Sequence, residues 1–160
     1  MVCAICPGSF DPITLGHVDL ISRAAGMFPR VVVAVSKNTE KTTLFTREER
    51  AELIRGALKE LKNVEVTFFD GLLAEFAREY SPAVLVKGLR NTIDFEYEMQ
   101  MSVINKSQNS ALETVFLPCD PRWYHISSAV IKDLYLYGGD AGGYLPENAL
   151  CALKKKYIGL

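Results

Sequence analysis

Five short apolar segments alternate with helical patterns along this chain, and that alternation limits its fold more than any other feature. The segments predict strands: Val2–Cys6, Val31–Val35, Val64–Phe69, Ala83–Lys87 and Glu113–Leu117. Helical stretches lie between and after them: Leu15–Met27, Thr46–Leu61, Leu72–Tyr80, Thr92–Lys106, Ser127–Tyr137 and Pro146–Lys156. We therefore predict an α/β fold, a single-domain, Rossmann-like, doubly wound parallel five-stranded sheet with helices on both faces, over residues 1–160.

Length and charge exclude several classes of protein. The chain has 160 residues, the size of one ordinary domain. With 18 Lys and Arg against 19 Asp and Glu, it lacks the basic excess of a general nucleic-acid binder. Its N-terminus does not resemble a signal peptide, and no apolar run is long enough to cross a bilayer. We therefore expect a cytoplasmic protein that binds neither nucleic acid nor membranes.

Two patterns that resemble functional motifs have simpler interpretations. Cys3 and Cys6 match a redox C-x-x-C spacing, but within a strand their side chains point to opposite faces, too far apart for a disulfide. The glycine-rich stretch over residues 138–143 follows a predicted helix and does not fit G-x-G-x-x-G, so we predict a loop.

The segment after the first predicted strand carries the residues best suited to chemistry. It reads Pro7-Gly8-Ser9-Phe10-Asp11-Pro12-Ile13-Thr14-Leu15-Gly16-His17 and opens the first predicted helix. Gly8 permits close backbone approach to a ligand, and free N–H groups at a helix start favour phosphate. Gly16 leaves space beside His17, whose imidazole can then meet a nucleotide phosphate. A lone histidine is more often structural, but this position after a strand end favours a ligand contact.

This block resembles the signature of the adenylyl- and cytidylyltransferase superfamily, which shares its T/H-x-G-H element with class I aminoacyl-tRNA synthetases. A second block, Lys87-Gly88-Leu89-Arg90 followed by Asp94-Phe95-Glu96-Tyr97-Glu98, resembles the K/R-G-L-R and D-F-E-Y-E segments of the phosphopantetheine adenylyltransferases. The helical spacing of Phe95, Met99 and Val103 predicts packing residues.

Further segments extend the resemblance over nearly the whole chain. Trp123-Tyr124-His125-Ile126-Ser127-Ser128-Ala129 resembles the family's I-S-S-x segment, with Ser127 as the expected N-cap and Ala129 where a hydroxyl is common. Lys41, before Phe45-Thr46-Arg47-Glu48-Glu49-Arg50, resembles the family's K…F-T-x-E-E-R. Leu73 matches the wall of its pantetheine pocket.

The resemblance implies transfer of AMP from ATP to 4′-phosphopantetheine, giving dephospho-coenzyme A and pyrophosphate. It implies His17, Lys41 and Ser9 as catalytic residues. It implies that ATP meets Ser9, Phe10, His17, Gly88, Leu89, Arg90, Glu98, Trp123, Tyr124, His125, Ile126, Ser127, Ser128 and Ala129. It implies that the acceptor meets Ser9, Lys41, Leu73 and Lys87. No protein metal site is expected, and Mg²⁺ is expected to arrive on the ATP phosphates. The family also implies a homohexamer and feedback inhibition by coenzyme A.

Two alternatives stay open at this stage. A related adenylyl- or cytidylyltransferase with another acceptor, such as nicotinate mononucleotide, would share the first block, but we expect it to lack the block from Lys87 to Glu98. A non-catalytic nucleotide sensor on the same fold would be expected to have lost His17, Lys41 or Arg90, and all three are present.

Overall fold

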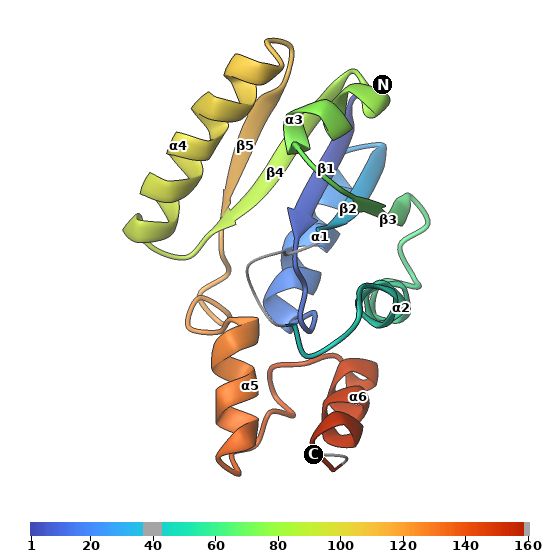
Figure 1. Cartoon of the computed structure of the whole chain (residues 1–160), viewed down its shortest axis with the longest axis vertical. Helices are drawn as coiled ribbons and strands as arrows, with labels where there is room; N and C mark the ends of the chain where they lie inside the picture. The colour runs from blue at the N-terminus through green and yellow to red at the C-terminus, as the bar shows by residue number, and fades with distance from the viewer. Residues whose placement is uncertain (37–42, 159–160) are drawn as a thin grey trace.

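The apolar segments form a parallel sheet, as predicted. The computed structural model describes residues 1–36 and 43–158. Its five parallel strands lie in the order β3-β2-β1-β4-β5 (Figure 1). They are β1 (Cys3–Gly8), β2 (Arg30–Ser36), β3 (Val64–Phe69), β4 (Ala83–Leu89) and β5 (Glu113–Pro118). The chain runs outward from β1 to β3 on one side and then from β4 to β5 on the other, so the order reverses between β1 and β4.

The helices begin close to their predicted starts, and the side chains of Thr14, Thr46, Asn91 and Ser127 cap four of them. They are α1 (Leu15–Met27), α2 (Arg47–Ala57), α3 (Leu73–Phe76), the 3₁₀ turn η1 (Ala77–Tyr80), α4 (Thr92–Gln108), α5 (Ser128–Leu136) and α6 (Glu147–Ile158). Thr46 and Glu49 form the capping box of α2, which ends at Ala57 rather than at the predicted Leu61. The predicted helix over 72–80 divides into α3 and η1. No described helix is long and apolar enough to span a membrane.

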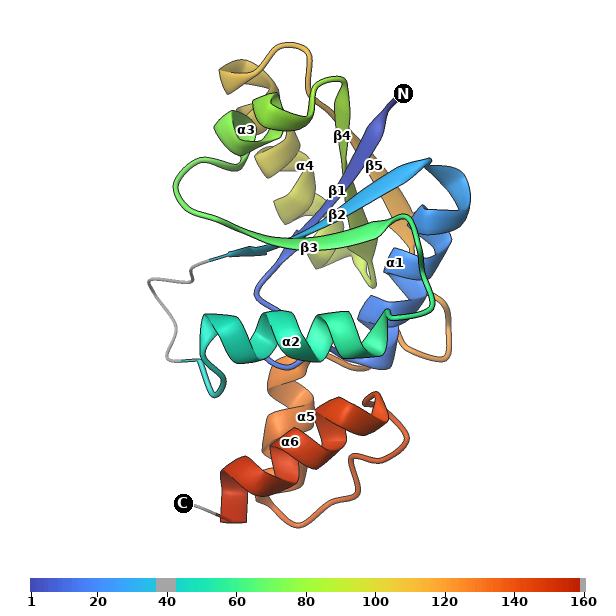
Figure 2. The same cartoon turned by 90° about the vertical axis from the view of Figure 1, so that its right-hand side faces the viewer.

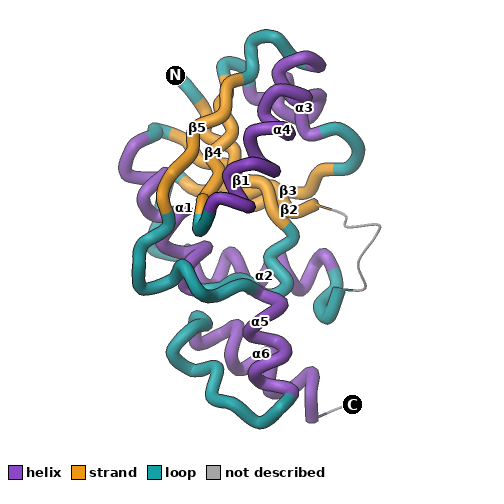
Figure 3. The backbone as a smooth tube through the Cα atoms, turned by 90° about the vertical axis from the view of Figure 1, so that its left-hand side faces the viewer, coloured by secondary structure: helices purple, strands orange, loops and turns teal. Residues whose placement is uncertain are grey.

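Two apolar clusters cover opposite faces of the sheet, which confirms the doubly wound architecture. One contains Ala4 and Cys6 together with residues of α1, α2, α5 and α6. The other contains Cys3 and Ile5 with residues of α3 and η1. Figures 2 and 3 show α3 and α4 on the side of the sheet away from α1 and α2. Cys3 and Cys6 therefore face different cores, as their odd spacing predicts, and both are free thiols.

Helix α4 departs from the prediction for its apolar face. Phe95, Met99 and Val103 were expected to be packing residues, but their exposed fractions are 43%, 39% and 65%. Asn105 is the one buried residue of this helix, all of which is described. The spacing correctly indicated one apolar stripe, but a stripe does not specify how completely it is covered. The Phe95 ring packs edge-on against Phe116 of β5, with centroids 6.0 Å apart, while much of the stripe stays exposed. The glycine-rich stretch forms the predicted loop between α5 and α6, with Gly138 at a φ of 83°.

Candidate functional site

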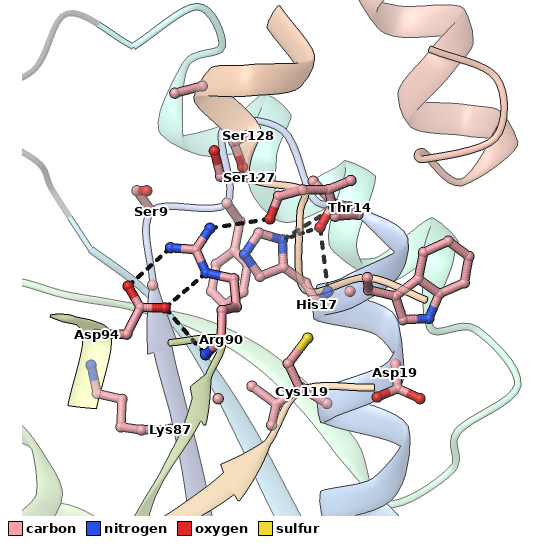
Figure 4. Close-up of a pocket in the computed structure, with 18 of the residues that line it drawn as sticks. Ser9, Thr14, His17, Asp19, Lys87, Arg90, Asp94, Cys119, Ser127 and Ser128 are labelled. Carbon is pink, nitrogen blue, oxygen red and sulfur yellow. Dashed lines mark hydrogen bonds and ion pairs between the residues drawn. The ribbon is translucent and has the colours of Figure 1, made fainter. Parts of the chain in front are cut away.

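A cavity of about 710 Å³ lies where the strand order reverses, beyond the carboxyl ends of β1 and β4. This is the position at which open α/β sheets bind ligands. Residues following β1, β4 and β5 meet in it (Figure 4). Among the predicted site residues, those lining it are Ser9, Phe10, His17, Lys87, Gly88, Arg90, Glu98, Trp123, Ile126, Ser127, Ser128 and Ala129.

Some predicted residues lie elsewhere. Leu89, Tyr124 and His125 are not in the cavity lining, although each neighbours a residue that is. His125 instead packs edge-on against Tyr124 and Tyr144. Leu73 packs against the apolar cluster beneath α3. Lys41 lies outside the described residues, and its predicted role stays a prediction.

His17 is fixed by the start of α1. The backbone N–H of Thr14 donates to its Nδ1 at 3.0 Å, while the N–H of His17 donates to Thr14 Oγ1 at 3.4 Å. This is a capping box with histidine in place of the usual Glu or Gln. Because Nδ1 accepts a hydrogen bond, the proton of the neutral ring belongs on Nε2, which remains available to the cavity. Burial, and secondarily the nearby Arg90 charge, lower the pKa of His17 to about 4. At neutral pH His17 is therefore an uncharged hydrogen-bond donor.

The turn that carries Ser9 is held by packing. Phe10 is buried and has a φ of 49°, a left-handed backbone conformation that residues other than glycine rarely adopt. Its ring packs edge-on against His17, with centroids 5.0 Å apart. A Cβ at Gly8 would lie 2.9 Å from the Phe10 ring, so only glycine fits here without a shift. Beneath the turn, buried Arg50 donates to the carbonyl oxygens of Ser9 and Ser36, at 2.5 and 3.2 Å.

Asp11 joins this turn to two distant segments. It is buried and accepts the backbone N–H groups of Leu44 and Phe45, at 3.0 and 2.9 Å. Lys132 of α5, which also lines the cavity, pairs with it at 2.6 Å. One carboxylate thus connects the β1–α1 turn with the segment before α2 and with α5.

The start of α5 presents fewer free hydroxyls than its sequence suggests. Ser127 is the predicted N-cap, and its oxygen accepts the N–H of Val130 at 3.2 Å. The Ser128 hydroxyl donates to the carbonyl of Pro12 at 2.7 Å, so its proton is already engaged. For an anion the helix start offers its N–H groups and positive dipole, together with the Ser127 O–H, whose oxygen acts only as an acceptor in the cap. These do not depend on a hydroxyl at position 129, where this chain has Ala129.

Charged side chains line the β4 side of the cavity. Lys87 pairs with Glu98 at 3.1 Å, and Arg90 pairs with Asp94 at 2.9 Å. Arg90 also donates to the carbonyl of Ile126 at 3.1 Å, which links this side to the segment before α5. Together these groups and the α5 start suit a polyanionic ligand such as a nucleotide triphosphate.

Sequence reasoning missed Asp11, Thr14, Arg50, Asp94 and Lys132 as site residues. The contact of Thr14 with the predicted His17 could have been found by extending the capping-box pattern to T-x-x-H. Asp11 gave no signal of its own, because its partners lie 33, 34 and 121 residues away. Arg50 was indistinguishable from a solvated helix arginine, since only the fold shows it to be buried.

Known proteins are similar to this chain over nearly its whole length. Residues 5–134 match the cytidylyltransferase-like family model. A phosphopantetheine adenylyltransferase of Symbiobacterium thermophilum is 46% identical over 157 residues, covering 98% of this chain and 97% of that protein. Those of Caldanaerobacter subterraneus subsp. tengcongensis and Haemophilus influenzae (strain PittEE) are both 43% identical, covering 98% of this chain and 98% and 100% of those proteins.

A solved structure shares the fold. It comes from Vibrio parahaemolyticus, is provisionally named as a nicotinate-nucleotide adenylyltransferase, and superposes with a TM-score of 0.69. The match covers 99% of this chain and 92% of that chain at 19% sequence identity, so it supports the α/β architecture alone.

Proposed function

The chain belongs to the cytidylyltransferase-like family and, within it, to the phosphopantetheine adenylyltransferases, and from this premise we propose that it transfers AMP from ATP to 4′-phosphopantetheine. The products are dephospho-coenzyme A and pyrophosphate, a step of coenzyme A biosynthesis. The observation that carries the proposal is the convergence of three separate motif blocks in one cavity, with His17, Arg90 and the start of α5 facing the same space.

The chemistry is an in-line displacement at the α-phosphorus of ATP. An oxygen of the acceptor phosphate forms the new P–O bond, the bond to the β-phosphate oxygen breaks, and pyrophosphate leaves. A phosphate monoester has a second pKa of about 6, so the acceptor is already largely dianionic at neutral pH and needs no general base. Catalysis then rests on positioning and charge stabilisation.

The described residues divide these tasks. Neutral His17 donates Nε2–H toward the phosphate on which charge develops, and its capping bonds keep the ring oriented. Arg90 and the N–H groups of α5 hold the β- and γ-phosphates. Ser9 and Lys87 face the acceptor phosphate from the ends of β1 and β4. The proposed role of Lys41 rests on its sequence motif.

Mg²⁺ belongs to the proposal as an ion that enters with ATP. Among the described residues no three His, Cys, Asp or Glu side chains form a metal-binding group. In this proposal an ion at the site takes its ligands mainly from phosphates and water, which Mg²⁺ readily accepts. It would supply neutralising charge on the triphosphate.

The proposed assembly is a homohexamer inhibited by coenzyme A. Supporting it, α4 exposes a set of large apolar side chains that a subunit contact would cover: Ile93, Phe95, Tyr97, Met99, Val103 and Ile104. Light scattering would test the hexamer, and product inhibition kinetics would test coenzyme A. A cytoplasmic location stays a prediction from the sequence.

The decisive experiment measures pyrophosphate release with several acceptors and identifies each product by mass. We expect turnover with ATP and 4′-phosphopantetheine. Nicotinate mononucleotide with ATP, and glycerol 3-phosphate with CTP, serve as matched alternatives. Turnover with either alternative in place of 4′-phosphopantetheine would contradict the proposed acceptor. ATP binding without any turnover would favour a nucleotide sensor.

A further inference from the structure

Two cations and two carboxylates alternate along the β4 side of the cavity. Lys87 and Arg90 lie at the end of β4, and Asp94 and Glu98 lie one turn apart on α4. Each cation has its own carboxylate partner, and all four side chains line the cavity. Lys87 and Arg90 are three residues apart, and their partners Glu98 and Asp94 are four residues apart, so the two ion pairs form next to each other.

The two pairs differ in how firmly they hold the cation. Lys87 meets Glu98 through a single ammonium nitrogen, at 3.2 and 3.1 Å from the two carboxylate oxygens. Arg90 meets Asp94 through two nitrogens, with Nε 2.9 Å from Oδ2 and Nη2 3.2 Å from Oδ1. This forked contact fixes the plane of the guanidinium as well as its position.

A third contact completes the clamp on Arg90. Its Nη1 donates to the carbonyl oxygen of Ile126 at 3.1 Å, in the segment before α5 (Figure 4). A guanidinium has five N–H donors, and these contacts use three of them. As far as the described residues show, one N–H on Nη1 and one on Nη2 remain for a ligand, on a group whose orientation is already set.

Asp94 also takes part in two hydrogen bonds at the start of α4, which are separate from its pairing with the Arg90 side chain. It stands in the first turn of α4, where Asn91 is the N-cap and accepts its backbone N–H at 2.9 Å. Its Oδ2 accepts the backbone N–H of Arg90 at 3.2 Å. Both bonds stabilise the helix start whatever the side chain of Arg90 does.

We propose that Asp94 is a positioning residue that holds the Arg90 guanidinium ready for the β- and γ-phosphates of ATP. The inference rests on the proposed function, which supplies the polyphosphate ligand. Asp94 acts through Arg90 and does not itself contact the reacting atoms. Because the clamp exists before ATP arrives, binding does not have to order a long flexible side chain.

The test measures the Kd of ATP and of AMP by calorimetry for wild type, Asp94→Asn, Arg90→Ala and the double variant. Asparagine keeps an oxygen for the helix-start bonds but removes the charge and one acceptor of the fork. We expect Asp94→Asn to weaken ATP binding about tenfold and to leave AMP binding unchanged, since AMP lacks the outer phosphates. In the Arg90→Ala background the same substitution should have no further effect on ATP binding.

Two further variants separate positioning from folding. Glu52→Gln removes the ion pair with Arg55 on α2, away from the cavity, and should leave the affinity for ATP unchanged. Asp94→Glu keeps the charge and should recover part of the lost affinity.

The alternative outcomes are distinct. Equal weakening of ATP and AMP, or a full loss from Asp94→Asn in the Arg90→Ala background, would overturn the positioning role. A wild-type protein that binds no ATP would overturn it as well. If these proteins bind ATP and AMP as expected while 4′-phosphopantetheine is not adenylylated, the positioning role of Asp94 is supported and the proposed acceptor is contradicted.

Discussion

The two sides of the cavity are built on different physical principles. The β1–α1 side is buried and fixed by backbone contacts: Phe10 in a left-handed conformation, His17 in a capping box, and Asp11 accepting two N–H groups. The β4–α4 side consists of partly buried ion pairs, whose side chains are 20% to 36% exposed. Substitutions on the first side should therefore affect folding and the chemical step, whereas those on the second should mainly affect ligand affinity.

The largest effect expected on the buried side comes from His17→Ala. Loss of one donor to the developing charge should lower kcat by about 10²–10³. His17→Gln is the matched variant, because glutamine can complete the capping box without an imidazole. Turnover rates should be compared with thermal midpoints for both. Wild-type turnover in His17→Gln would show that the ring serves the helix and not the reaction.

Asp11→Ala tests how strongly the buried side depends on one carboxylate. Removal leaves Lys132 and two backbone N–H groups without their acceptor, so the free energy of unfolding should fall by about 3 kcal/mol. Urea unfolding measures this directly. Asp133→Ala, an exposed position on the same helix as Lys132, should change stability by less than about 0.5 kcal/mol. Similar stabilities for the two variants would show that the β1–α1 side does not depend on the Asp11 carboxylate.

Gly8→Ala probes the packing beneath the turn. The added Cβ would press on the buried Phe10 ring, and the variant should lose about 2 kcal/mol of stability together with activity. Gly26→Ala is the control, since nothing lies within 4 Å of a Cβ at that position on α1. That control should be neutral or slightly stabilising. A Gly8→Ala protein with unchanged unfolding midpoint would mean that the Phe10 ring has room to move.

On the charged side, Lys87→Met should separate affinity from stability. We expect the KM of the acceptor to rise about tenfold, while the free energy of unfolding changes by less than about 0.5 kcal/mol. Lys87→Arg keeps the charge and the pairing with Glu98, and should change that KM less than about threefold. Raising the salt concentration should increase the KM of the acceptor more for wild type than for Lys87→Met. A large loss of stability in Lys87→Met would contradict the expectation that substitutions on the β4–α4 side mainly affect ligand affinity.

The smallest effect expected is that of His17 ionisation near neutral pH. Its pKa is lowered to about 4, so NMR of the imidazole should show no titration between about pH 8 and pH 6. The unfolded chain, with an ordinary histidine pKa of about 6.5, binds a proton that the folded chain does not. The contribution of His17 to stability is therefore complete above that value and falls as the pH decreases toward about 4. A midpoint near 6.5 in the folded protein would show that the ring is not desolvated.

How far the sequence predicts the site depends on the distance over which each residue interacts. The capping of α2 was predicted from Thr46 and Glu49 because both partners lie within one turn. The position of the cavity followed from parallel topology. The pairing of Asp11 with Lys132 was not predictable, because it joins elements 121 residues apart. The partial exposure of Phe95 and Met99 was not predicted either, because a local period carries no information about how completely a stripe is covered.

The sequence by itself determined the strands, the helix starts, the order of the βα units and the motif blocks at the strand ends. These depend on side-chain periodicity, caps and turns, which act between neighbouring residues. Only the tertiary structure decided which unpredicted side chains share the cavity with the predicted ones, that His17 is neutral, that Arg50 is buried, and that Asp94 holds Arg90. Desolvation and pairing between distant segments exist only once the chain has packed, because both depend on what surrounds a group in space.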